Sequence, residues 1–113
     1  MALEITTEQL KRCDMIKATG RIDGQSAPKL AEAFHALIDA GRFRIVFDMG
    51  GVEFLSSAGL HALIDAQKTC KRWNRGEVVL ASVPPQVYEV LEMVGFVHLF
   101  KIYDNAVQAV GSF

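Results

Sequence analysis

Two adjacent serines, Ser56 and Ser57, are the residues whose type and position most strongly suggest chemistry in this sequence. They follow an apolar strand-like segment and a glycine pair, and they precede apolar residues at helical spacing. A hydroxyl at a helix N-terminus lies beside unpaired N–H groups and the positive end of the helix dipole, and both favour an anion. The position therefore suits phosphate chemistry, and it suggests a protein that is modified rather than one that catalyses.

Two other interpretations of the double serine are open. One of the serines is simply an N-cap, a role that serine often fills. The segment Ser57-Ala58-Gly59 also matches half of the Gly-x-Ser-x-Gly nucleophile elbow, but Leu55 occupies the place of the first glycine. Neither His61 nor His98 pairs with Ser57 and an acid in the order of a known triad, so the sequence disfavours a serine hydrolase.

The other residues that could bind a ligand or react predict no cofactor and no metal site. Gly50-Gly51 lacks the glycine spacing and the lysine of a P-loop and is interpreted as a turn. Cys13 and Cys70 lie far apart without a CxxC pattern, which predicts two reduced, packed thiols. The three histidines are scattered and are expected at surface or half-buried positions. Trp73, near a helix end, is expected to be a packing lid.

The composition predicts one soluble, cytoplasmic domain spanning residues 1–113. Half of the residues are hydrophobic, so a core can form without disulfides or a metal. The net charge of −1 gives no electrostatic sign of binding to nucleic acid or to an anionic membrane surface. The N-terminus lacks the pattern of a signal peptide, and no apolar run approaches the roughly 18 residues of a membrane span.

The first half of the chain must provide three strands and a helix. Alternation predicts strands at Leu3–Thr6 and at Asp14–Thr19, the second closed by Gly20, with a hairpin turn between them. Ser26 is the expected N-cap of a helix that ends at Gly41, with an apolar stripe at three-and-four spacing. A short apolar strand is expected at Arg44–Asp48.

The second half alternates helices with strands. The predicted elements are a helix from the double serine with Gln67 on its apolar face, a strand at Val78–Ala81, a helix from Pro84-Pro85 to Gly95, a short strand within Phe96–Ile102, and a final helix capped by Asp104. Alternation of this kind implies crossovers between parallel strands, while the first hairpin adds antiparallel ones. The expected α/β fold is one mixed sheet with about four helices packed against it.

Motifs along almost the whole chain resemble those of the STAS domain, the fold of bacterial anti-sigma factor antagonists. They are, in order, Thr19-Gly20-Arg21-Ile22-Asp23, Arg44 to Met49, Val52 to Leu60, Pro84-Pro85-Gln86-Val87, Leu91 to Phe96 and Leu99 to Asp104. The resemblance implies a regulator that is not an enzyme. It also implies that an anti-sigma factor, itself a serine kinase, phosphorylates a serine at the start of the second helix. The unmodified antagonist binds that kinase and frees a sigma factor, the modified form does not bind, and a serine phosphatase restores it.

Alignment of this motif on its glycine and leucine makes Ser57 the phosphate acceptor. Ser56 then replaces the aspartate that relatives usually carry, and Ala58 replaces a second hydroxyl, which confines modification to one site. The N–H groups of Ala58, Gly59 and Leu60 are expected to hold the phosphate. The resemblance implies a partner-binding surface made of Asp23, Ser26, Ser56, Ser57, Ala58, Gly59 and His61.

Two other functions remain open for such a chain. It could be a STAS module that scaffolds a signalling assembly without being phosphorylated. It could also sense a small ligand or nucleotide with the loops beside Ser57.

Overall fold

The computed structural model describes residues 2–113, so the first residue of the predicted 1–113 domain lies outside the described part. Five strands form one sheet in the order β1-β2-β3-β4-β5. Their bounds are β1 Glu4–Gln9, β2 Asp14–Ile22, β3 Arg44–Leu55, β4 Glu77–Ala81 and β5 Ile102–Tyr103. Strands β1 and β2 pair antiparallel, and all later neighbours pair parallel. The predicted mixed sheet is confirmed.

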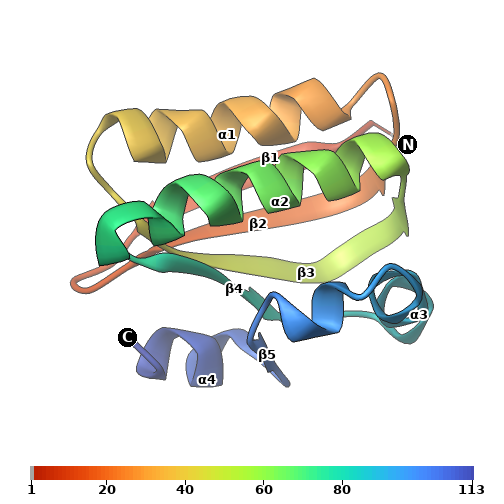
Figure 1. Ribbon diagram of the computed structural model, residues 1–113. Helices are drawn as coiled ribbons and strands as arrows, with labels where there is room; N and C mark the ends of the chain where they lie inside the picture. The colour runs from red at the N-terminus through yellow and green to blue at the C-terminus, as the bar shows by residue number, and fades with distance from the viewer. Residues whose placement is uncertain (1) are drawn as a thin grey trace.

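Four α-helices and two short 3₁₀ helices connect and cover these strands (Figure 1). Their bounds are α1 Ala27–Asp39, α2 Ser57–Lys71, η1 Arg72–Asn74, α3 Pro85–Met93, η2 Phe96–His98 and α4 Ala106–Gly111. Helices α1 and α2 lie on one face of the sheet and α4 lies on the other (Figure 1). A helix with the length and apolarity needed to cross a membrane is absent from residues 2–113.

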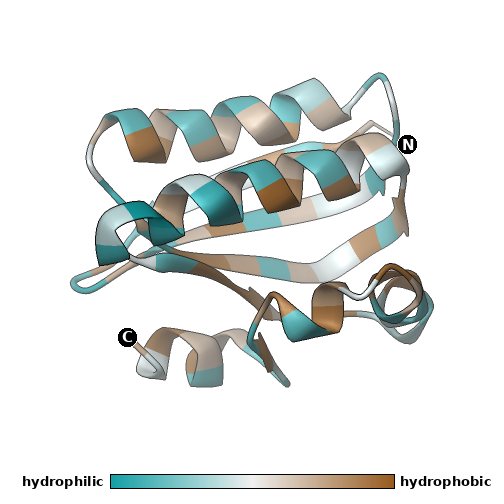
Figure 2. Cartoon of the chain, viewed as in Figure 1, coloured by the Kyte–Doolittle hydropathy of each residue, from teal (hydrophilic) through white to brown (hydrophobic). Residues whose placement is uncertain are grey.

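Alternate residues of the central strands supply two apolar layers. Ile45 and Phe47 of β3 pack into the larger core beneath α1, α2 and α3, whereas Val46 between them packs into the smaller core beneath α4. This follows from the two-residue period of a strand. Helices α1 and α2 change between apolar and polar residues along their length (Figure 2), as expected of helices that bury one side.

Two predicted strand ends are wrong because the glycines that mark them lie inside strands and do not end them. Gly20 does not close β2, which continues to Ile22, and Gly50-Gly51 is not a turn but part of the twelve-residue strand β3. A Cβ atom on Gly51 would lie 2.7 Å from Oγ1 of Thr19 on β2. Gly51 therefore lets two strands approach closely where their register shifts, and it breaks neither.

Three predictions in the second half also need correction. The segment after Gly95 forms the 3₁₀ helix η2, and β5 has only two residues. Asn105 rather than Asp104 caps α4, because its side chain accepts a hydrogen bond from the N–H of Gln108. Trp73 is not a packing lid, since 77% of its surface is exposed.

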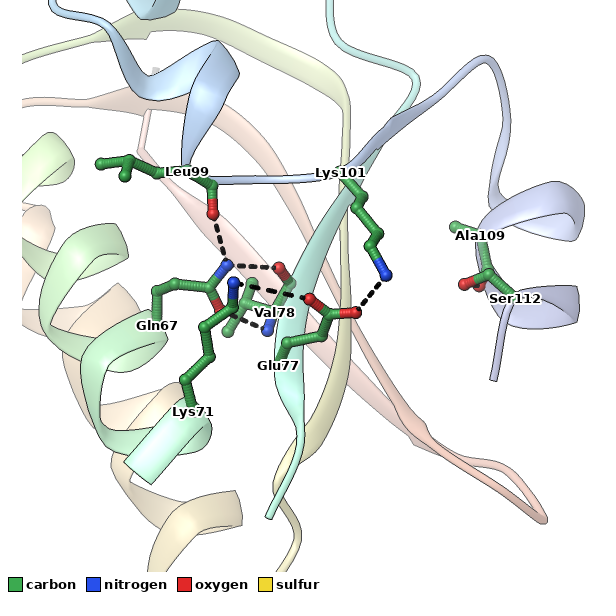
Figure 3. Close-up of polar contacts among 8 residues, drawn as sticks. All are labelled: Gln67, Lys71, Glu77, Val78, Leu99, Lys101, Ala109 and Ser112. Atoms are coloured by element: carbon green, nitrogen blue, oxygen red, sulfur yellow. Dashed lines mark hydrogen bonds and ion pairs between the residues drawn. The ribbon is translucent and has the colours of Figure 1, made fainter. Parts of the chain in front are cut away.

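The buried side chain of Gln67 joins α2 to the edge of β4 (Figure 3). Its Nε2 donates to the carbonyl oxygens of Val78 at 3.1 Å and Leu99 at 2.8 Å, and its Oε1 accepts from the N–H of Val78 at 2.7 Å. Strand β5 pairs only with Leu80 and Ala81 and does not reach Val78. The amide thus takes the place of a neighbouring strand and satisfies backbone groups that would otherwise be buried without partners.

We expect Gln67→Leu to lower the free energy of unfolding by about 2–4 kcal/mol, although leucine is the more apolar residue. The substitution leaves the N–H and C=O of Val78 and the C=O of Leu99 without partners. Urea unfolding measures the change. Gln86→Leu, at an exposed position of α3, is the matched control and should change stability by less than about 0.5 kcal/mol. Equal stabilities of the two variants would contradict this role.

Candidate functional site

Ser56 fixes the passage from β3 into α2. Its backbone is extended, with φ −85° and ψ 172°, and its N–H donates to the carbonyl of Ile22 at 2.8 Å. Its Oγ accepts from the N–H of Gly59 at 3.3 Å, which makes Ser56 the N-cap of the helix. Ser56 is therefore already engaged at both its backbone and its side chain.

The first turn of α2 packs against the ends of β2 and β3 through Gly59. A Cβ atom added to Gly59 would lie 2.6 Å from Cδ1 of Leu55 and 2.7 Å from Cγ2 of Ile22. Glycine is thus needed here because the helix backbone lies directly on two core side chains. This contact sets how far the residues before Gly59 stand from the sheet.

Ser57 is the first residue of α2, and it is exposed. The N–H of Leu60 donates to the carbonyl of Ser56 at 3.0 Å, and that of Gly59 is taken by the Ser56 hydroxyl. Within residues 2–113, the N–H groups left without a partner in this turn are those of Ser57 and Ala58. The expectation that Ala58, Gly59 and Leu60 all offer free N–H groups is therefore wrong for the last two.

Asp23 and Ser26 form a tight turn before α1. The Asp23 carboxylate accepts from the N–H groups of Gln25 and Ser26, each at 3.0 Å. Ser26 stands at the predicted N-cap position, but its hydroxyl makes no cap bond to α1. It accepts from the N–H of Asp23 at 2.9 Å and lies 2.7 Å from the carbonyl oxygen of Arg21. The hydrogen bonds from Ser26, its backbone N–H foremost, lower the pKa of Asp23.

The structure brings the two predicted segments together at one end of the sheet. Ile22, which bonds to Ser56, directly precedes Asp23, and the beginnings of α1 and α2 lie at the same end of the molecule (Figure 1). Asp23 and Ser26 line a hollow of about 310 Å³, but Ser57 is not among its lining residues. His61 is exposed one turn after Ser57. No hydrogen bond between described residues joins the Asp23 turn to the side chains of residues 56–61.

Arg21 and Phe54 extend this surface, although the sequence marks them only as members of the family motifs. They are paired across β2 and β3, and the Arg21 guanidinium lies 4.4 Å from the centre of the Phe54 ring. Phe54 is 39% exposed. Their pairing depends on register shifts between β2 and β3, which no signal in the sequence reveals.

The cysteines lie away from this surface, in the core. Both are buried and unpaired, and burial raises the pKa of the Cys70 thiol to about 11. That thiol stays protonated at neutral pH, as expected of a packing residue. His35, His61 and His98 are all exposed, as predicted. Among residues 2–113, no three His, Cys, Asp or Glu side chains gather as metal ligands.

Comparison with known proteins settles the family. The family model for the STAS domain matches residues 4–109. The chain belongs to the STAS family. BtrV of Bordetella bronchiseptica, a candidate anti-sigma factor antagonist, is 28% identical over 111 residues, which cover 98% of this chain and 95% of that protein. Anti-sigma factor antagonists are regulators and not enzymes.

Solved structures of antagonists have the same fold. An anti-sigma factor antagonist from Mycobacterium paratuberculosis superposes with a TM-score of 0.88 at 22% identity, over 98% of this chain and 93% of that one. SpoIIAA of Bacillus has been solved in its phosphorylated form, which superposes with a TM-score of 0.77 at 14% identity, over 96% of this chain and 98% of that one. Its unphosphorylated form has also been solved.

We expect Gly59→Ala to destabilise the protein by about 1–3 kcal/mol, because the new methyl group overlaps Leu55 and Ile22. Thermal or urea unfolding measures the change. Gly111→Ala in α4 is the control, since no atom lies within 4 Å of the added Cβ, and it should be neutral or slightly stabilising. Leu55→Val removes the Cδ1 atom that the new methyl group would meet. It should therefore lower the free energy of unfolding less in the Gly59→Ala background than in the wild type. Additive losses of stability in the double variant would contradict the proposed contact.

The Asp23 turn predicts a measurable pH effect. Because the folded-state pKa of Asp23 lies below its ordinary value of 3.8, its contribution to stability is present above that value and is lost as the pH falls through the folded pKa. Carbon-detected NMR titration of the carboxyl should give a pKa below 3.8. Ser26→Ala should raise it only part of the way, because the N–H donors of Gln25 and Ser26 remain. An unchanged pKa in Ser26→Ala would contradict a contribution from the hydroxyl.

Proposed function

We propose that this STAS protein is an anti-sigma factor antagonist whose binding is switched off by phosphorylation of Ser57. In its unmodified form it binds an anti-sigma factor that is also a serine kinase, in the cytoplasm, and releases a sigma factor. A serine phosphatase reverses the modification. The observation that carries the proposal is that the two serines have different structural roles. Ser56 is held as the helix cap, while Ser57 is exposed to solvent at the start of a 15-residue helix.

A phosphate on Ser57 is compatible with the fold. It would carry about 1.5 to 2 negative charges beside the positive end of α2. The N–H groups of Ser57 and Ala58, which have no partner within residues 2–113, are available to it. Neither the N-cap bond of Ser56 nor the contact of Gly59 with Leu55 has to change. The modification would therefore alter the surface and not the core.

A partner packed over Ser57 would respond strongly to the same group. The partner would meet added bulk and a charge that must lose its water on binding. A loss of 1.4 kcal/mol already weakens affinity about tenfold. The surface around Ser57 that we assign to the partner consists of Asp23, Ser26, Ser56, Ala58 and His61, with Arg21 and Phe54 beside them. Gly59, also predicted for this surface, is buried and supports it from below. The surface combines an exposed ring, a guanidinium and hydroxyls, which are common at protein interfaces.

The relatives support this proposal. BtrV and the mycobacterial protein carry the name of anti-sigma factor antagonist, and SpoIIAA is known in both an unphosphorylated and a phosphorylated form. The scaffold and ligand-sensor alternatives predict a different outcome, because neither needs a phosphate on Ser57.

We expect Ser57→Asp to weaken binding to the host's anti-sigma factor kinase at least tenfold and Ser57→Ala to preserve it. The introduced carboxylate imitates part of the phosphate charge, whereas alanine removes only the hydroxyl. Calorimetry on the purified pair measures both affinities. Ser112→Asp makes the same change at an exposed position near the C-terminus and should bind like the wild type. Equal affinity of the two Ser57 variants would overturn the proposed switch.

The modification itself needs a separate measurement. Incubation with the kinase and ATP should add one phosphate by intact mass, and peptide mapping should place it on Ser57. Ser57→Ala should remain unmodified, whereas Ser56→Ala should still be phosphorylated. Phosphate on Ser56, or none on either serine, would reject Ser57 as the acceptor.

A further inference from the structure

A basic surface lies at the end of the sheet opposite Ser57. Arg44 begins β3 and Leu55 ends it, so the two ends of this strand separate the surface from the start of α2 (Figure 1). Two hollows of about 350 and 450 Å³ adjoin each other there and share Arg44 as a lining residue. We call them together the basic groove. Six of the chain's twelve Lys and Arg residues line it, namely Lys11, Arg12, Arg42, Arg44, Lys71 and Arg75, against a single acidic lining residue, Glu77.

Most of these basic side chains form no ion pair within the described residues. Arg42 is engaged by the buried carboxylate of Asp14, and Lys71 lies 3.9 Å from Glu77, which also pairs with Lys101. Within residues 2–113, the side chains of Lys11, Arg12, Arg44 and Arg75 have no carboxylate partner. The Arg75 guanidinium is nevertheless held in place, because it lies 5.0 Å from the centre of the Phe43 ring. Like charges gathered without anions of their own repel one another, so an anionic partner would relieve a cost the free protein bears.

A strained turn presents the only tryptophan of the chain beside this groove. Trp73 and Asn74 have left-handed backbones, with φ of 63° and 55°, and they directly precede Arg75. Asparagine adopts this conformation at little cost, whereas a bulky residue such as tryptophan adopts it only with strain. The turn is held by the bond from the N–H of Gly76 to the carbonyl of Cys70 and by contact of Gly76 with the Phe43 backbone. Folding explains the turn but not a strained, 77% exposed tryptophan in it.

We propose that the basic groove and Trp73 form a second interaction surface, which binds an acidic segment of a protein partner. Tryptophan and arginine are the residue types most enriched among the anchors of protein interfaces. Guanidinium groups match carboxylates in shape and charge, and the Arg75 group is already ordered against Phe43. Both hollows are open to solvent and share Arg44 as a lining residue, so an extended segment lying across Arg44 could contact both.

The same features disfavour the other anionic ligands. Pockets for small molecules are mostly apolar, whereas charged side chains dominate the lining of this groove. A long nucleic acid would extend past the groove onto a protein whose net charge is −1. An acidic peptide segment needs only the groove itself.

The test uses the full chain and two fluorescein-labelled peptides in which glycine alternates with either glutamate or glutamine. The glutamate peptide should bind with a saturable change in anisotropy, should change the emission of Trp73, and should bind more weakly as salt is added. The glutamine peptide should not bind. Equal binding of the two peptides, or no binding of either, would overturn the proposal. Tighter binding of an oligothymidylate than of the glutamate peptide would also overturn it, in favour of a nucleic acid.

Matched variants locate the contact. Arg12→Gln with Arg75→Gln should weaken binding of the glutamate peptide about tenfold. Lys17→Gln with Lys68→Gln removes the same charge from exposed positions outside the groove and should leave affinity unchanged. Equal losses in the two double variants would show attraction to net charge alone and would overturn the assignment of the groove.

Trp73→Gly separates binding from folding. Glycine relieves the left-handed strain, so the melting temperature should not fall, while binding of the labelled glutamate peptide should weaken. A variant that melts no lower and binds less tightly supports the proposal. A variant with unchanged affinity would overturn the role of Trp73.

Discussion

The contact of Gly59 with Ile22 and Leu55 is the constraint on which the candidate site depends. It places the first turn of α2 directly on the ends of β2 and β3, at a distance so short that only glycine fits at this position. The bond from the N–H of Ser56 to the carbonyl of Ile22 fixes the same junction from the other side. Ser57 lies between these two attachments and takes part in neither. Its exposure is therefore a consequence of how its neighbours are held.

The same junction explains why Asp23 and Ser57 share one end of the molecule. Parallel strands present their carboxyl ends at a common edge, and the segments after β2 and β3 both leave the sheet there. The Asp23 turn is held by its own hydrogen bonds with Ser26, independently of α2. Two separately stabilised segments thus meet around the backbone of Ile22. A charge added to one of them changes the shared surface without requiring the other to move.

Much of this arrangement could be predicted from local pattern. Signals that span only a few residues predict the two long helices, the cap at the double serine and, from these, the order of elements. Each of these predictions is confirmed. The errors arose where distant residues decide the outcome. Gly51 is explained only by Thr19 on the neighbouring strand, and the pairing of Arg21 with Phe54 only by the shifted register. The turn that contains Trp73 is held through Gly76, which lies against the backbone of Phe43 on a segment distant in the sequence.

Because β3 is long, the proposed switch and the basic groove lie at opposite ends of the molecule. The proposed switch lies beyond Leu55, and the basic groove begins at Arg44, eleven residues earlier on the same strand. The core between them is closely packed, with Phe47 and Met49 fully buried. The molecule is 31 Å long, whereas salt screens an exposed charge over about 10 Å. A charge on Ser57 would therefore have little electrostatic effect at the far end. A partner held in the groove would therefore stay bound while the anti-sigma factor binds and leaves, so that phosphorylation would control one of two contacts and leave the other in place.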